Sequence, residues 1–203
     1  MVKTRKLFAT LAAMLVLMAV VGTATAQRTY YLGHEWAKTW INPNGSIDLF
    51  YDISITLVSG QNINFVYVGQ PNGDFAIGTA MDQYGHVLTT FDASSGSDYK
   101  VRVNLYTPLV AGQTVSFNLT TNVADMVYED TKNPGNVGML FTPTWWSEAT
   151  VNDLRVSTVL PQGVNVSQVK TSVNWNNTAT EPDGRLSVYW ERSNLQPDKS
   201  YEF

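Results

Sequence analysis

Apolar and polar residues alternate along much of the chain after residue 26. The alternation is clearest over residues 46–58 and recurs over residues 99–106, 113–121 and 185–190. A period of two predicts β-strands with one face buried and the other in water. In the first of these strands the predicted inward residues are Ile47, Leu49, Tyr51, Ile53, Ile55 and Leu57.

Turn-forming residues separate the predicted strands at short intervals. Glycine supplies a positive φ and proline presets the first turn position, so clusters of Gly, Pro, Asn and Asp mark turns. We expect about ten short strands and no amphipathic helix after residue 26. This pattern predicts an all-β fold, an antiparallel β-sandwich, with one sheet closed on itself as the alternative. The clusters of turn-forming residues lie at residues 42–45, 71–74, 82–85, 94–97, 133–135, 161–163 and 182–184.

The first 26 residues form a separate segment. Lys3, Arg5 and Lys6 precede an apolar run over residues 7–21, and Ala24 and Ala26 place small residues before a cleavage point. This pattern is typical of a cleavable secretory signal peptide, and the apolar run is shorter than the roughly 20 residues of a membrane span. We therefore expect an exported domain over residues 27–203. A turn-rich acidic stretch at residues 122–137 is interpreted as a long loop, with a boundary between two small lobes as the alternative.

The charge and the amino-acid composition exclude several kinds of binding and catalytic site. Without residues 1–26 the chain has 177 residues and keeps all 17 acidic but only ten basic residues, for a net charge of −7. A nucleic-acid partner is not expected of such an acidic chain. There is no cysteine, and neither His34 nor His86 has a partner at metal-ligand spacing. No serine-nucleophile motif and no phosphate-binding glycine loop occurs. We predict no catalytic residues, no metal site and no cofactor.

Six tryptophans are the most unusual part of the composition. Exposed indoles stack on the apolar faces of sugar rings, whereas indoles on the inward face of a strand pack in the core. The alternation of Leu186 and Val188 continues to Trp190, which we expect in the core. The candidate ligand-binding residues are Trp36, Trp40, Trp145 and Trp146.

Four asparagines lie in the acceptor pattern for N-glycosylation, in which a residue other than proline and then Ser or Thr follow. In an exported chain they are candidate modification sites if the host has the transferase. They are Asn44, Asn118, Asn165 and Asn176.

A family resemblance rests on three short features. These are residues 44–47 opening a strand that continues to Tyr51, a mid-chain strand pair, and residues 151–163 ending in Leu160, Pro161, Gln162 and Gly163. The chain resembles the extracytoplasmic β-domain of predicted membrane proteins of unknown function. In that family a signal peptide precedes the β-domain and a transmembrane helix follows it. The resemblance implies display at the cell surface and supplies no catalytic residues.

Three functions follow from these observations. The first is an exported, non-catalytic cell-surface module that binds or assembles an envelope component. The second is a carbohydrate-binding module that uses exposed tryptophans on a surface glycan. The third is self-assembly into a surface filament or layer, completed by a donated strand. Residues 201–203 resemble the start of an unfinished strand, so we expect a truncated C-terminus, with any membrane anchor beyond residue 203 and a short terminal edge strand as the alternative.

Overall fold

The computed structural model describes residues 28–197 and 199–203 of the chain. The predicted signal peptide lies outside the described residues. The prediction of an all-β sandwich is confirmed, because the regular secondary structure of the described part is made of β-strands and a single three-residue 3-10 helix, η1 (Val166–Gln168). One sheet has seven strands in the order β11 (Asn177–Thr180), β12 (Leu186–Leu195), β10 (Thr150–Val159), β1 (Thr29–Ile41), β2 (Ile47–Ser59), β7 (Thr114–Val123) and β4 (Phe75–Asp82). A second sheet has the order β3 (Ile63–Gly69), β6 (Lys100–Leu109) and β5 (Thr90–Asp92), and β8 (Val127–Glu129) pairs with β9 (Val137–Met139).

The two longest strands, β1 and β2, form a hairpin at the middle of the large sheet. The turn between them closes through a hydrogen bond from the Asn42 amide to the Ser46 carbonyl, 2.9 Å long. Gly45 has a φ of +82°, a conformation that L-residues with a side chain rarely adopt. On its other side β1 pairs with β10, and this pairing is parallel, whereas the other strand pairs of the described sheets are antiparallel.

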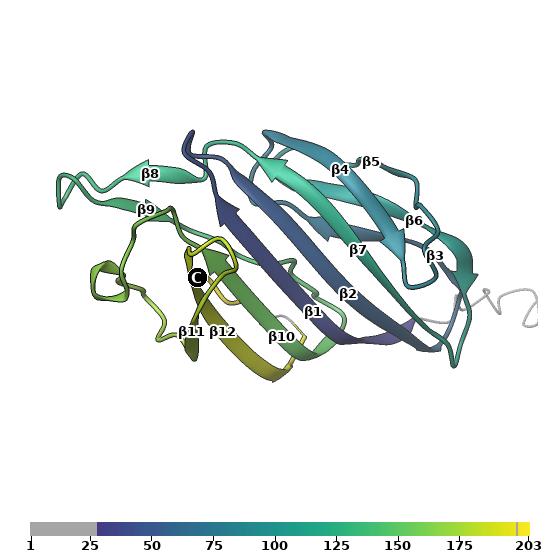
Figure 1. Cartoon of the computed structure of the whole chain (residues 1–203). Helices are drawn as coiled ribbons and strands as arrows, with labels where there is room; N and C mark the ends of the chain where they lie inside the picture. The colour runs from purple at the N-terminus through teal and green to yellow at the C-terminus, as the bar shows by residue number, and fades with distance from the viewer. Residues whose placement is uncertain (1–27, 198) are drawn as a thin grey trace, which may run out of the picture.

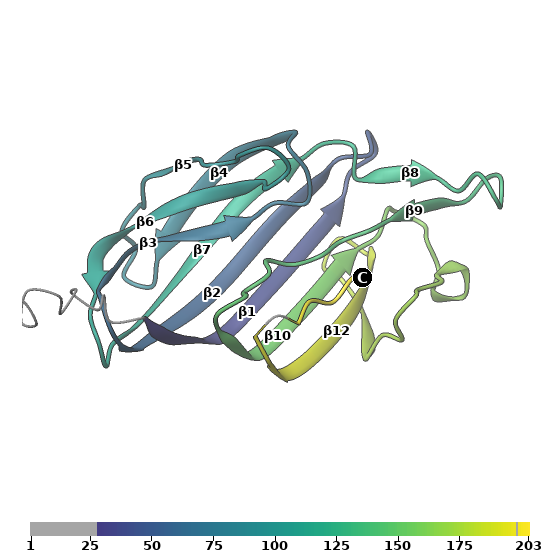
Figure 2. The ribbon, with the colours of Figure 1, turned by 180° about the vertical axis from the view of Figure 1, so that it is seen from behind.

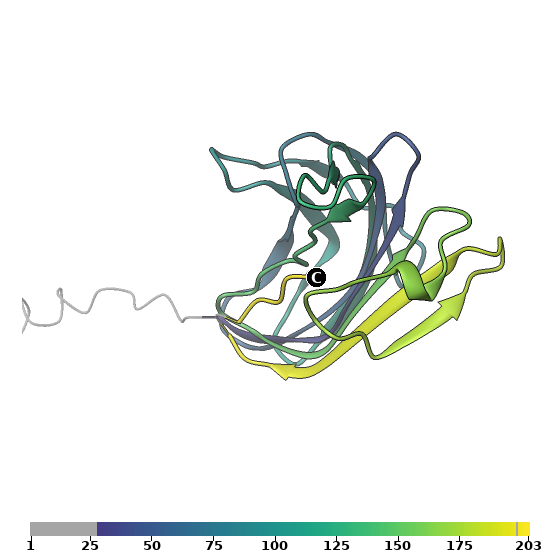
Figure 3. The same ribbon diagram turned by 90° about the vertical axis from the view of Figure 1, so that its left-hand side faces the viewer.

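The small sheet covers part of the large one. In Figures 1 and 2 the β3–β6–β5 sheet lies over the region of β2 and β7, and the β8–β9 ribbon extends beyond the end of the large sheet. Figure 3 shows that the large sheet is strongly curved, with the C-terminus on its inner side. There the amide and carbonyl of Phe203 exchange two 2.8 Å hydrogen bonds with those of Phe141. Strands from both sides of residues 122–137 belong to the large sheet.

The core lies between the inner faces of the two sheets. All six predicted inward residues of β2, from Ile47 to Leu57, are at most 1% exposed. The small sheet contributes buried valines to the same cluster, from Val66 on β3 to Val103 on β6. Trp190 is 4% exposed, as its place in the alternation predicts, and its indole N–H donates to the carbonyl of Val173.

The β2 alternation predicts unequal effects of truncation along this strand. Ile53→Ala leaves a cavity between the sheets and is expected to lower the free energy of unfolding by about 2–5 kcal/mol. Val58→Ala, at a position that is 51% exposed, is expected to change it by less than about 0.5 kcal/mol. Urea unfolding of both variants measures the difference, and equal losses would contradict the assignment of the buried face.

Candidate functional site

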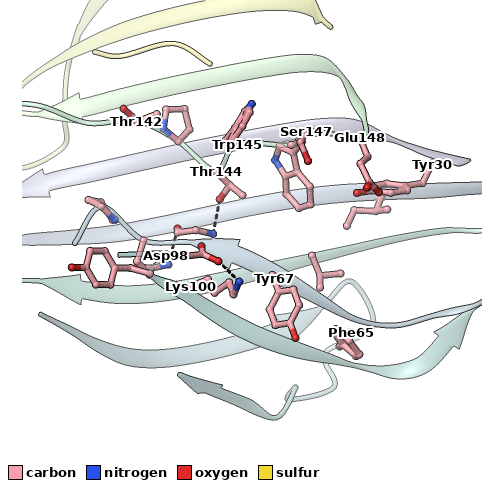
Figure 4. Close-up of a pocket in the computed structure, with 18 of the residues that line it drawn as sticks. Tyr30, Phe65, Tyr67, Asp98, Lys100, Thr142, Thr144, Trp145, Ser147 and Glu148 are labelled. Atoms are coloured by element: carbon pink, nitrogen blue, oxygen red, sulfur yellow. Dashed lines mark hydrogen bonds and ion pairs between the residues drawn. The ribbon is translucent and has the colours of Figure 1, made fainter. Parts of the chain in front are cut away.

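A groove of about 790 Å³ opens between the small sheet and a chain segment that precedes β10. One wall is β3 together with the turn that leads into β6. The other is residues 142–148, here called the 142–148 segment, which has no regular secondary structure (Figure 4). Buried apolar residues form the floor, among them Ile55, Ile63 and Val66. The groove therefore combines an apolar floor with two polypeptide walls.

Exposed aromatic side chains stand on both walls. Trp145 on the 142–148 segment is 58% exposed, and Tyr67 on β3 is 43% exposed. The Lys100 ammonium lies 4.9 Å from the centre of the Tyr67 ring and also pairs with Asp98. The Arg102 guanidinium lies 3.7 Å from the centre of the Phe65 ring. These cation–π contacts fix the orientation of the β3 aromatics, because Lys100 and Arg102 both belong to the neighbouring strand β6.

The far end of the groove carries a tyrosine between opposite charges. Burial and the negative charge of Glu148 raise the pKa of Tyr30, and the positive charge of Arg28 acts in the opposite direction. Arg28 is held in place because its guanidinium donates to the carbonyls of Gln61 and Asn62 at 3.2 and 3.1 Å. This end of the groove is polar but carries no excess of either charge.

Two hydrogen bonds fix the 142–148 segment to the rest of the molecule. The Gly69 amide donates to Thr144 Oγ1 at 3.1 Å, which ties the segment to β3 (Figure 4). The Trp146 indole N–H donates to Glu35 Oε2 at 2.9 Å, which ties it to β1. Trp145 and Trp146 thus point to different environments, since Trp145 is at the surface and Trp146 packs against the core.

Glu35 is an unusual residue for this position. It is 1% exposed on the inner face of β1, and its Oε1 has no hydrogen-bond partner, nor has the buried hydroxyl of Tyr51. Burial raises the pKa of Glu35 to about 8, although the Trp146 indole and Thr144 act to lower it. The side chain is therefore protonated at neutral pH, because an ionised carboxylate loses its hydration in the core.

The other two candidate tryptophans lie elsewhere. Trp36 and Trp40 are half-buried on β1, on the outer face of the large sheet and away from the groove. Trp36 stacks on His34 with ring centres 4.2 Å apart, lies under the Arg155 guanidinium and donates from its indole nitrogen to Asp153. Trp40 borders a shallow hollow of about 420 Å³ together with Phe50, Asp48 and Asn122. The structure brings Trp145 and Trp146 together in one site and leaves Trp36 and Trp40 on a separate surface.

The glycosylation candidates are at or near the surface. Asn44, Asn165 and Asn176 are exposed, and Asn118 is half-buried on the outer face of β7. The Asn176 side-chain oxygen accepts hydrogen bonds from the Glu191 amide and from Arg192. Occupancy of all four sites stays a prediction.

The titratable side chains form pairs rather than larger groups. His34 Nε2 lies 3.0 Å from Asp52 Oδ1, and His86 Nδ1 lies 2.9 Å from Asp82 Oδ2. The ring of His86 also stacks on Tyr106 at 3.9 Å. In residues 28–197 and 199–203, no three His, Asp or Glu side chains are arranged to hold a metal ion. No helix of this part of the chain has the length and apolar character needed to span a membrane.

Comparison with known proteins gives a likeness in fold alone. No family model matches the chain, and no curated protein sequence matches it either. The chain is similar to a solved M1 zinc metallopeptidase from Deinococcus radiodurans, with a TM-score of 0.53 and 14% identity over 81% of the chain. It is also similar to a putative protease from Parabacteroides distasonis, with a TM-score of 0.50 and 14% identity over 84% of the chain. The chain spans only 39% and 36% of these two structures.

The protonation of Glu35 predicts a pH dependence of stability. The folded state holds this proton up to a pH of about 8, whereas the unfolded chain releases it near the ordinary value of 4.5. The folded state therefore binds more protons between these values, and stability falls as pH rises through this window, by at most about 5 kcal/mol.

Urea unfolding at pH 5 and pH 8.5 tests this, with Glu35→Gln as the matched control. The glutamine keeps an oxygen for the Trp146 indole but does not ionise, so its variant should lose less stability over the same range. Identical pH profiles for the two proteins would contradict the assignment.

Proposed function

We propose that the protein is an exported, non-catalytic binding module of the cell surface, and that the groove beside the 142–148 segment binds an envelope component. The proposal that the protein is exported rests on the signal-peptide pattern of residues 1–26. The binding role rests on one observation, the exposure of Trp145 and Tyr67 on opposite walls of a groove with an apolar floor. Exposed aromatic side chains at a groove supply much of the binding energy in protein interfaces.

The absence of catalysis is supported by the sequence. The two histidines are 52 positions apart, and the helix-borne zinc motif with two histidines four residues apart does not occur. The M1 metallopeptidases share the fold with this chain over less than half of their own length. The activity of those enzymes is therefore not part of this proposal.

Removal of the Trp145 indole is expected to weaken envelope binding at least about tenfold, which corresponds to about 1.4 kcal/mol. Co-sedimentation of the purified protein with isolated envelope fractions measures the apparent affinity of Trp145→Ala and of wild type. Because Trp145 is mostly exposed, the unfolding midpoint should not change.

Trp36→Ala is the matched control for this experiment, since it removes the same side chain from the outer face of the large sheet and lies outside both candidate surfaces. It should leave envelope binding unchanged. Equal binding by Trp145→Ala and wild type would show that the groove is not the binding surface.

A carbohydrate-binding surface around Trp40 is the second candidate. Trp40 and Phe50 supply aromatic faces beside Asp48 and Asn122. Asn122 donates to Asp48 at 2.7 Å, and the remaining side-chain oxygens of the pair can accept from hydroxyl groups. Trp36 supports this role less well, because its ring contacts both His34 and Arg155 and its indole nitrogen donates to Asp153. The Trp40 ring has one such contact, with the Lys38 ammonium at 5.1 Å.

If this surface binds glycans, Trp40→Ala is expected to abolish signals on a glycan array, whereas Trp36→Ala should retain them. Calorimetry with any oligosaccharide identified on the array would give the affinities. An array without binding by the wild-type protein would exclude the second candidate.

A further inference from the structure

We infer that the groove takes an extended polypeptide segment of a partner protein, which adds as a strand to the free edge of β3. This inference rests on the proposed function, because it names the ligand class of the same groove. It depends on the backbone of β3, on the shape of the groove and on its charge.

The small sheet ends at β3, so one side of this strand lacks a neighbouring strand. Successive residues of a strand point their amide and carbonyl groups to opposite sides. The Gln70 amide donates toward β6, to the Tyr99 carbonyl, whereas the Gly69 amide donates away from β6, to Thr144 Oγ1. The register with β6 is regular from Phe65 to Gly69. The backbone groups of Phe65 and Tyr67 therefore point to the same side as the Gly69 amide, toward the 142–148 segment.

The edge groups of Gly69 are bonded to side chains, the amide to Thr144 Oγ1 and the carbonyl to Gln70 Nε2, whereas those of Phe65 and Tyr67 have no partner in the described residues. Within residues 28–197 and 199–203, no backbone hydrogen bond joins β3 to the 142–148 segment, and a side chain, Thr144, bonds to the edge at Gly69. An edge strand with unpaired amides and carbonyls is a template for another extended chain. A sugar or a lipid lacks the regular spacing of donors and acceptors that this edge presents.

The groove follows the edge of β3 and not its face. Phe65, Val66 and Tyr67 all line it, although the side chains of consecutive residues point to opposite faces of a strand. Residues 142–148 line the opposite wall without a gap. The walls meet at Gly69, where a Cβ would lie 3.6 Å from the Thr144 Cα, so the open part of the edge is Phe65 to Tyr67. A chain lying beside these residues would pass its side chains alternately over the apolar floor and toward the exposed Tyr67 ring.

The charge of the groove fits a peptide of low net charge. Arg28 and Lys100 line it together with Asp98 and Glu148, two residues of each sign. Such a balance does not favour a polyanion or a polycation. The partner segment we expect is uncharged overall, with apolar or β-branched residues at alternate positions.

The experiment starts from a phage-displayed library of random heptapeptides selected on the purified protein. A selected peptide is then synthesised with blocked ends, and its affinity is measured by calorimetry. N-methylation at each position in turn removes one amide proton. We expect an alternating pattern, in which methylation at every second residue lowers the affinity about tenfold and methylation at the intervening residues does not.

Two variants of Tyr67 test the same edge from the protein side. Tyr67→Pro removes the inferred edge amide, at a strand position where proline is tolerated because this N–H has no partner within the sheet. Tyr67→Ala removes the ring and keeps the amide. The proline variant should bind the peptide at least fivefold more weakly than the alanine variant, with both folded by circular dichroism.

The outcomes separate the inference from the proposed function. Equal tolerance of methylation at all positions, or equal affinities of the two Tyr67 variants, would overturn strand addition while leaving the groove as a binding site. Failure to select any peptide, with envelope binding still dependent on Trp145, would overturn the peptide class alone. Loss of Trp145 dependence as well would overturn both. Self-association that Tyr67→Pro abolishes would assign the edge to a second copy of the chain and also overturn a partner peptide.

Discussion

The structure depends on the burial of one face of a seven-stranded sheet. A sheet that alternates inward and outward residues has an apolar face that must be covered, and hydrophobic burial is the main favourable term in folding. Here the β3–β6–β5 sheet covers part of that face, and the C-terminal residues cover another part through Phe203, whose ring packs 5.3 Å from Trp190. The 142–148 segment lies between the small sheet and β1. The groove exists because this segment closes the interface at a few points and not along its whole length.

Glu35 links this segment to the interior. The Trp146 indole needs an acceptor where it meets the core, and Glu35 Oε2 supplies it from the central strand β1. The cost is a carboxyl group in an apolar layer, with Oε1 and the Tyr51 hydroxyl lacking partners. Buried polar groups without hydrogen bonds are uncommon because each loses its hydration without compensation. An apolar residue at position 35 would remove that cost but would also leave the Trp146 indole without its acceptor.

The sequence predicted those strands in which alternation is uninterrupted. β2, β6, β7 and β12 correspond to the four alternating stretches, and their inward residues are the ones that the pattern indicates. β1 was missed because polar residues occupy inward positions, Glu35 and Thr39, and because the register shifts between Leu32 and His34. The parallel pairing of β1 with β10 joins strands more than 100 residues apart, and alternation carries no information about which strands become neighbours.

The site was predictable only in part, for a similar reason. Trp145 and Trp146 were identified by residue type, but their partners Glu35, Tyr67 and Gly69 come from distant parts of the chain. A glutamate within a stretch of inward-facing positions was the available signal for Glu35, and the missing alternation in β1 concealed it. The edge of β3 has no sequence signal, because an edge strand and a central strand show the same alternation when one face is buried.

The two candidate surfaces differ in how far their interactions are already satisfied. On the outer face, the Trp40 ring is contacted by the Lys38 ammonium at 5.1 Å, and Asn122 donates to Asp48 at 2.7 Å, so a ligand there would have to compete with existing contacts. In the groove the Trp145 ring is exposed, and the backbone edge of β3 is bonded to the 142–148 segment only at Gly69. Binding releases more free energy where the ligand completes interactions than where it replaces them. This difference, and not the number of aromatic residues, favours the groove over the outer face of the sheet.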